Sequence, residues 1–235
     1  MKVGIIAAGL GERLQAAGIR EPKPLVHVAG TPLIDYSLGA VAAAGLRQVA
    51  CIVNELSSGI EEHCRQAWPQ LELEFIRRTT PSSMESLFAL GPLLRNERFL
   101  LLTTDSIFAP AVLAGFLAAA NRRPSAHGVL ALADFIDDEK PLWARVEDNG
   151  QVTALGPAAA GSGLVTAGFY VFHPAIFEEI DAARKARFSA LRQFLGHLLE
   201  RGYDIFGETV GKTVDVDRPE DITVAEAFVR GGFRA

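Results

Sequence analysis

Short apolar runs alternate with longer amphipathic stretches along the chain, and this alternation predicts the fold. We expect strands at residues 2–7, 48–54, 71–76, 98–104, 127–133, 142–147, 164–172 and 203–208. Several runs, such as FLLL, are apolar at consecutive positions, which is typical of strands covered by helices on both faces. The pattern therefore predicts an α/β fold, a Rossmann-like three-layer αβα arrangement around a mostly parallel mixed sheet.

The stretches between these runs have helical spacing and capping residues. Thr31 is predicted to cap a helix that has Pro32 at its first position. Ser82 and Asp217 are predicted to cap two further helices, because each is followed three residues later by a glutamate, the spacing of a capping box. The apolar face of residues 191–199 repeats every three or four positions and predicts another helix.

Composition and charge narrow the classes of protein to consider. The chain has 235 residues, of which 49% are hydrophobic and 22% charged, and this is ordinary for a globular protein. A net charge of −5 argues against general nucleic-acid binding. Cys51 and Cys64 lie outside any CxxC pair and are expected to be free thiols in a reducing compartment. The apolar stretch at 109–120 is shorter than the roughly 20 residues of a membrane-spanning helix, so we expect a cytoplasmic protein without a membrane partner.

A turn of small residues follows the first predicted strand and contains Gly9 and Gly11. Such a turn exposes backbone N–H groups that can hold phosphate. The GxGxxG pattern of dinucleotide-binding proteins is not met, because Leu14 occupies the third glycine position. Arg13 and Lys23 follow, and Lys23 lies between two prolines that stiffen the backbone. Two cations beside a nest of amides suit a triphosphate, although either residue alone is more typical of a surface charge.

Acidic residues follow two extended segments. Asp105 ends the buried run at 98–104, and ligands of open α/β sheets bind beyond the carboxyl ends of strands. Mg²⁺ usually takes one or two carboxylates, so Asp105 is a candidate ligand; the alternative is a turn aspartate. Asp215 and Asp217 lie two residues apart, so in extended backbone both can reach one ion. For Asp217 the competing role is the helix cap described above.

Two strings, GIIAAGLGERL and PKPLVHVAGTPLIDYSL, resemble the signature of the sugar-1-phosphate nucleotidylyltransferases and have that family's spacing between them. The resemblance covers residues 3–38 and returns in patches over the rest of the chain. It implies a Mg²⁺-dependent reaction in which an NTP and a phosphorylated acceptor give an NDP-linked product and pyrophosphate. A sugar 1-phosphate is the first expectation for the acceptor. The late aspartate of the family matches Asp215 best.

The resemblance also implies roles for individual positions. Arg13 and Lys23 are expected to be the catalytic cations, and Mg²⁺ is expected on Asp105, Asp215 and Asp217. The expected nucleotide contacts are Ala7, Ala8, Gly9, Gly11, Arg13, Ser82, Ser83 and Ser86. The expected acceptor contacts are Ala167, Gly168 and Trp143. Asn54, at a strand end, is a weaker candidate for the base.

The acceptor region departs from the family pattern. Thr166 replaces a usual asparagine, Trp143 and Ala144 replace a common Tyr-Gly, and TALGPAAAGSG lacks the Glu-Lys pair of the sugar-specific members. A CTP-dependent cytidylyltransferase for phosphocholine or a polyol phosphate is therefore an alternative, in which Trp143 contacts a cationic headgroup. For Trp143 itself, a place in the core is the simpler interpretation. A molybdenum-cofactor-type guanylyltransferase and a nucleotide-sensing module without turnover are further alternatives.

The organisation of the chain follows from these assignments. Residues 1–126 alternate strand and helix, whereas 127–235 are richer in strands. We expect one nucleotidyltransferase domain, 1–235, with a nucleotide-binding half at 1–126 and an acceptor-binding half at 127–235. The segment GPAAAGSG at 156–163 is equally compatible with a mobile lid and a surface loop. No hexapeptide-repeat domain follows GGFRA, so a bare catalytic unit is expected, with its oligomeric state left open.

Overall fold

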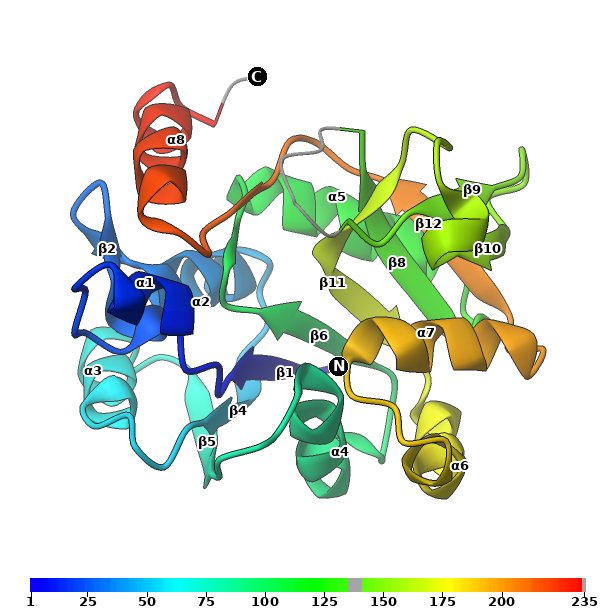
Figure 1. Cartoon of the computed structure of the whole chain (residues 1–235), viewed down its shortest axis with the longest axis horizontal. Coiled ribbons are helices and arrows are strands. Elements are labelled where there is room, and N and C mark those ends of the chain that lie inside the picture. Colours follow the sequence, from blue (N-terminus) through cyan, green and yellow to red (C-terminus); the bar gives the residue numbers. More distant parts are fainter. Residues whose placement is uncertain (135–140, 234–235) are drawn as a thin grey trace.

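The central feature of the computed structural model, which describes residues 1–134 and 141–233, is a seven-stranded sheet (Figure 1). Its strands, in spatial order, are β12 (Ile205–Thr209), β8 (Gly128–Ala133), β11 (Val165–Phe172), β6 (Phe99–Thr103), β1 (Lys2–Ala7), β4 (Gln48–Val53) and β5 (Glu72–Arg77). β11 is antiparallel to both neighbours, and the other pairs are parallel. The predicted mostly parallel mixed sheet is therefore confirmed.

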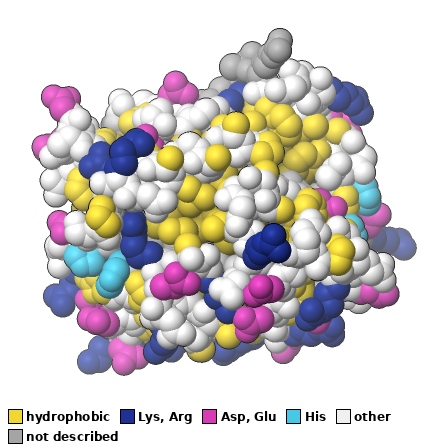
Figure 2. Space-filling view, turned by 180° about the vertical axis from the view of Figure 1, so that it is seen from behind, with side chains coloured by type: hydrophobic (Ala, Val, Ile, Leu, Met, Phe, Trp, Pro, Cys, Tyr) yellow, Lys and Arg dark blue, Asp and Glu magenta, His cyan; other side chains and the backbone are white. Residues whose placement is uncertain are grey.

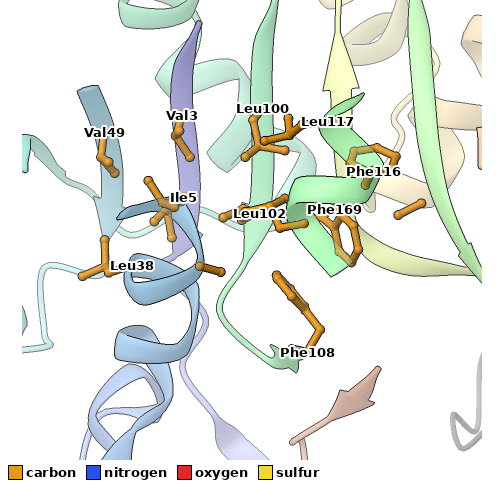
Figure 3. Packing of buried hydrophobic residues seen from close by; sticks show 14 of the residues in the cluster. Val3, Ile5, Leu38, Val49, Leu100, Leu102, Phe108, Phe116, Leu117 and Phe169 are labelled. Carbon is orange, nitrogen blue, oxygen red and sulfur yellow. The ribbon is translucent and has the colours of Figure 1, made fainter. Parts of the chain in front are cut away.

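Helices cover both faces of this sheet. One face packs against α2 (Leu33–Ala43), α3 (Ile60–Ala67) and α5 (Pro110–Asn121). The other face packs against α4 (Ser83–Leu94) and α7 (Leu191–Glu200), with α6 (Ile180–Lys185) and the 3₁₀ helix η3 (Pro174–Glu179) beside them. The alternation within β6 shows why both faces are apolar, since Leu100 and Leu102 pack on the first face and Leu101 on the second (Figure 3). This is the predicted three-layer arrangement.

Short elements at the edge of the sheet bring distant segments together. β7 (Ser106–Ile107) pairs with β13 (Val214–Asp215), which places Ser106 opposite Asp215. β2 (His27–Val28) pairs with β3 (Thr31–Pro32), and β9 (Ala144–Val146) pairs with β10 (Val152–Leu155). The remaining elements are α1 (Glu12–Ala16), α8 (Pro219–Arg230) and the 3₁₀ helices η1 (Lys23–Leu25) and η2 (Gly156–Ala159). The β7–β13 pair joins the end of β6 to the C-terminal part of the chain.

Two of the predicted helix caps are wrong and one is confirmed. Thr31 lies in β3, and α2 begins at Leu33 without a side-chain cap. α8 begins at Pro219, and the carboxylate of Asp221 accepts the backbone N–H groups of Asp217 and Arg218, so Asp217 is not the cap. The hydroxyl of Ser82, in contrast, accepts the N–H of Glu85 at 3.3 Å.

The strand boundaries differ little from the predictions, with one exception. The strand expected at 142–147 is shortened to β9, and Trp143 makes an isolated antiparallel bridge with Val165. The segment at 156–163 begins with η2, in which Ala159 is fully buried. Acidic and basic side chains are interspersed around an apolar band on the face away from the viewer of Figure 1 (Figure 2). Within residues 1–134 and 141–233, no helix has both the length and the hydropathy needed to span a bilayer.

Candidate active site

A cavity of about 440 Å³ opens beyond the ends of β1 and β6. Its walls come from the glycine loop after β1, from η1, from the start of α4 and from the turn after β6. The lining residues are Ile6, Ala8, Gly9, Leu10, Gly11, Glu12, Arg13, Lys23, Pro24, Thr80, Pro81, Ser82, Ser83, Ser86, Thr103, Thr104, Asp105 and Asp217. The structure thus brings most of the predicted phosphate, nucleoside and metal residues into one cavity at the carboxyl edge of the sheet.

The glycine loop fits closely against Lys23. Gly11 has φ +66°, a left-handed conformation that L side chains rarely adopt, and a Cβ built on it would lie 2.9 Å from Cβ of Lys23. Gly9 has no atom within 4 Å of such a Cβ, so its backbone faces open space in the cavity. Gly11 therefore allows the approach of the lysine, whereas Gly9 leaves room for a ligand.

Lys23 is the cation at the centre of the cavity. Its side chain is 9% exposed, and Nζ donates to Oδ2 of Asp105 at 3.1 Å and to Oδ1 of Asp217. Burial alone would lower the pKa of Lys23, but the two carboxylates outweigh this effect and raise the pKa. Arg13, which is half exposed on α1, places Nη1 3.5 Å from Oδ2 of Asp217. The two predicted cations therefore converge on one carboxylate.

Asp105 lies in the turn between β6 and β7. Burial raises the pKa of its carboxyl, but the Lys23 ammonium and a hydrogen bond from Thr103 act more strongly together and lower it. The backbone carbonyl of Asp105 accepts the N–H of Val216 at 2.9 Å, so the C-terminal segment is fixed beside it. Asp105 is thus held as a carboxylate at the edge of the cavity.

Asp215 and Asp217 lie near Asp105, as the sequence predicts, but in different contacts. The hydroxyl of Ser106 donates to Oδ1 of Asp215, whereas Asp217 shares Lys23 with Asp105. Within residues 1–134 and 141–233, no cluster of three or more His, Cys, Asp or Glu side chains is arranged so that it could hold a metal ion. Two carboxylates meeting at one cation nevertheless suit Mg²⁺, which takes its other ligands from phosphate and water.

Some residues predicted to contact the base and ribose line the cavity, whereas others are buried and hydrogen-bonded within the protein. Ser82, Ser83 and Ser86 line the cavity, but Ser86 is buried and hydrogen-bonded to Thr80 at 2.6 Å. Asn54 is buried and donates to the carbonyl of Ala8 at 3.2 Å, so it braces the glycine loop.

Ala7 is buried at the end of β1 and is absent from the described lining, unlike Ala8. Three cavity residues, Thr80, Thr103 and Thr104, were not predicted from the sequence. Thr103 and Thr104 directly precede Asp105, and this position could have indicated them.

The predicted acceptor residues are spread over different places. Gly168 has φ +80°, and a Cβ on it would lie 2.3 Å from Oγ of Ser106, so it abuts the aspartate region. Ala167 is 2% exposed and belongs to the core. Trp143 lines a second cavity, of about 630 Å³, beside α7. The structure therefore does not place Trp143 in the lining of the first cavity.

The fold and this site define a class of nucleotide-binding α/β protein, and comparison with known proteins gives the family. Residues 3–202 match the model of the MobA-like NTP transferase domain, so the chain belongs to that family.

Two relatives and one solved structure of the same fold show the range of similar proteins. The chain is 31% identical over 186 residues to CMP-5'-(3-aminopropyl)phosphonate synthase of Streptomyces rubellomurinus, covering 74% of this chain and 28% of the relative. It is 28% identical over 214 residues to glucose-1-phosphate thymidylyltransferase of Streptomyces antibioticus, covering 87% of this chain and 59% of the relative. The fold matches that of the inositol-1-phosphate CTP transferase from T. maritima with a TM-score of 0.83 at 19% identity, over 100% and 98% of the two chains. The chain spans less than two thirds of the length of these two curated relatives.

Proposed function

We propose that this protein is a nucleotidyltransferase that joins an NTP to a small phosphorylated or phosphonylated acceptor. An anionic oxygen of the acceptor attacks the α-phosphorus of the NTP and forms a new P–O bond. The bond from the α-phosphorus to the bridging oxygen breaks, and its electron pair leaves with pyrophosphate. The observation that carries this proposal is the position of Lys23, a buried cation held by two carboxylates next to a glycine loop.

The residues of the cavity act on charge and position. The amides of the glycine loop and Arg13 are placed to bind the leaving phosphates, and Lys23 to neutralise charge between the two reacting anions. No general base is required, because the attacking oxygen is already ionised. Catalysis of this kind rests on orientation and electrostatics.

The carboxylates fit a divalent ion. Asp105 and Asp217 converge on one ammonium, which supports their oxygens as ligands of a single cation, and Asp215 lies on the paired strand, where it accepts from Ser106. Asp105 and Asp217 would hold Mg²⁺, which when bound polarises the phosphates and offsets their charge, and Asp215 stays a predicted further ligand. The test is Mn²⁺ binding, followed by electron paramagnetic resonance, which should weaken at least tenfold both in Asp105→Asn and in Asp217→Asn. Unchanged Mn²⁺ binding in both variants would contradict this assignment.

The acceptor has two candidates. A sugar 1-phosphate is supported by the thymidylyltransferase relative, and a phosphonate with an alkylamine by the synthase relative. The experiment for the activity itself is pyrophosphate release with each of the four NTPs and a panel of phosphate acceptors. Release that needs both substrates supports the proposal, whereas NTP binding without release from any acceptor supports a nucleotide-sensing module instead.

A further inference from the structure

The second cavity is next to the first one. The hydroxyl of Ser83, which lines the first cavity, accepts the N–H of Leu191 at 3.4 Å, and the following residue, Arg192, lines the second. On the sheet side, the bridge from Trp143 to Val165 lies three residues before Gly168, which abuts Ser106. Three residues of strand span about 10 Å. The two linings therefore adjoin at the α4–α7 contact and along β11, within the length of a small molecule.

The lining of this cavity is mainly apolar. The described residues are Pro141, Leu142, Trp143, Leu155, Gly156, Pro157, Ala160, Phe188, Arg192, Gln193, Gly196, His197 and Glu200. The side-chain oxygen of Gln193 already accepts from Ser189, and Nε2 of His197 is paired with Glu179 at 2.7 Å. Because nine of the thirteen described lining residues are apolar or glycine, the described part of this lining suits a compact apolar body better than a polyhydroxylated ring.

Helix α7 adds a separation of charge. Arg192, Gly196 and Glu200 are four residues apart, so they lie on one face of the helix. The rise of the helix places the Cα atoms of Arg192 and Glu200 about 12 Å apart. Arg192 is at the end near the first cavity, and its charge acts on Tyr170 together with those of Asp105 and Asp215. A Cβ on Gly196 would have no atom within 4 Å, so the space between the two charges is open.

We propose that the second cavity binds the organic part of the acceptor, and that the acceptor is a small zwitterion with a phosphate or phosphonate at one end and an ammonium group at the other. This inference rests on the proposed nucleotidyltransferase function. The anionic end lies near Arg192 and the aspartates, the alkyl segment passes Gly196, and the ammonium group lies between the Trp143 ring and Glu200. An aromatic ring and a carboxylate are the groups that recognise an alkylammonium ion.

The first experiment measures kcat/KM for pyrophosphate release by the full chain with phosphocholine, phosphoethanolamine, 3-aminopropylphosphonate, glycerol 3-phosphate and glucose 1-phosphate. We expect the best of the three zwitterions to exceed glucose 1-phosphate and glycerol 3-phosphate at least tenfold. The ranking of the zwitterions separates a phosphate acceptor from a phosphonate. Equal or faster transfer to glucose 1-phosphate would overturn the zwitterion assignment and leave the nucleotidyltransferase function standing.

Three variants test the contacts. Trp143→Ala and Glu200→Gln should each lower kcat/KM for the best zwitterion about 5- to 20-fold without changing the Kd of the NTP. Gly196→Leu, which directs a side chain into the open space, should raise the KM of the acceptor by more than tenfold. Glu62→Gln, an exposed glutamate on α3, is the matched control and should change nothing. If the three variants behave like this control, the cavity does not hold the acceptor.

Direct binding distinguishes failure of this inference from failure of the proposed function. Titration of the full chain with phosphocholine, with and without CTP, should change the fluorescence of Trp143, and Trp143→Phe should lose that signal but keep binding by calorimetry. Binding without pyrophosphate release from any acceptor would support the cavity and overturn the transferase. Neither binding nor transfer with any of the three zwitterions would overturn the cavity assignment.

Discussion

The two halves of the molecule build their parts of the site in different ways. In residues 1–126, the phosphate end consists of a glycine loop, one lysine between prolines and one aspartate after a strand, all within short local segments. In residues 127–233, the second cavity is lined by side chains from 141–143, 155–160 and 188–200, which come together through the fold. The proposed phosphate site thus depends on backbone and fixed charge, whereas the shape of the second cavity depends on side chains from separate elements.

This difference has a physical origin. Phosphate groups carry the same charges in every NTP, so amides and cations on rigid loops serve them all. An acceptor is recognised by its shape and its polar groups, which only a set of convergent side chains can match. The first half can therefore rely on one local pattern, whereas recognition in the second half depends on individual side chains such as Trp143.

The largest expected effect tests the charge at the centre of the first half. Lys23→Met should lower kcat by about 10²–10³, because a preorganised charge contact to the transition state contributes roughly 3–4 kcal/mol. Binding of phosphocholine should weaken far less than kcat falls, because only its anionic end lies near Lys23 and the aspartates, whereas its alkylammonium part binds in the second cavity. Pyrophosphate release and calorimetry measure the two quantities.

Lys185→Met on α6 is the matched control, because this lysine is exposed and outside both cavities. A Lys23→Met variant with normal kcat would remove the central role given to this residue. A variant that loses phosphocholine binding as well would show that the two ends of the site are not separable.

The second prediction concerns Gly168, where the second half also depends on backbone. Gly168 has φ +80° at a register shift of β11, and an added Cβ would lie 2.3 Å from Oγ of Ser106 and 2.8 Å from Oγ1 of Thr103. Gly168→Ala should lower the free energy of unfolding by about 2–5 kcal/mol, from left-handed strain of about 1–2 kcal/mol and overpacking of about 1–3 kcal/mol. Urea denaturation measures this change.

Gly9→Ala is the comparison, because Gly9 has ordinary φ and open space around its Cβ position. It should leave the free energy of unfolding within about 0.5 kcal/mol and weaken NTP binding instead. Equal destabilisation by the two substitutions would mean that the contacts around Gly168 relax easily, and that this position does not fix the aspartate region.

The sequence predicted the site residues of the first half better than those of the second, because the first half uses short local motifs and the second uses side chains from separate elements. The carboxyl ends of parallel strands meet at one edge, so the glycine loop and Asp105 were expected together, and the β7–β13 pair adds Asp215 and Asp217. The assignment of Asp217 as a helix cap failed, because the N-cap is the next residue, Arg218, and Asp221 in the first turn accepts the N–H groups of Asp217 and Arg218. Of the described residues that line the second cavity, the sequence singled out Trp143 as a candidate acceptor contact. Arg192 and Glu200 belong to a helix whose apolar periodicity predicts only that one face packs on the core. That its polar face lines a cavity becomes visible only in the folded structure.

The smallest expected effect tests how the halves are held together at the surface. Arg184 on α6 donates from Nε and Nη2 to the two carboxylate oxygens of Glu85 on α4 at 2.9 and 2.7 Å, which joins the 127–233 half to the 1–126 half. The two side chains are 50% and 22% exposed, so Glu85→Gln should cost no more than about 1 kcal/mol of stability, and less at high salt. A cycle with Arg184→Gln and the double variant isolates the pair.

The pH dependence of this pair follows from the same geometry. The hydrogen bonds from Arg184 lower the pKa of Glu85 below its ordinary value of about 4.5. Because the pKa is depressed in the folded protein, the stabilisation is complete above the ordinary value and is lost as the pH falls through the folded-state pKa. Urea unfolding at pH 7 and below pH 4.5 should therefore show a difference between wild type and Glu85→Gln that shrinks in acid. A loss of several kcal/mol that is insensitive to pH would mean that this contact, rather than the shared sheet, holds the two halves in register.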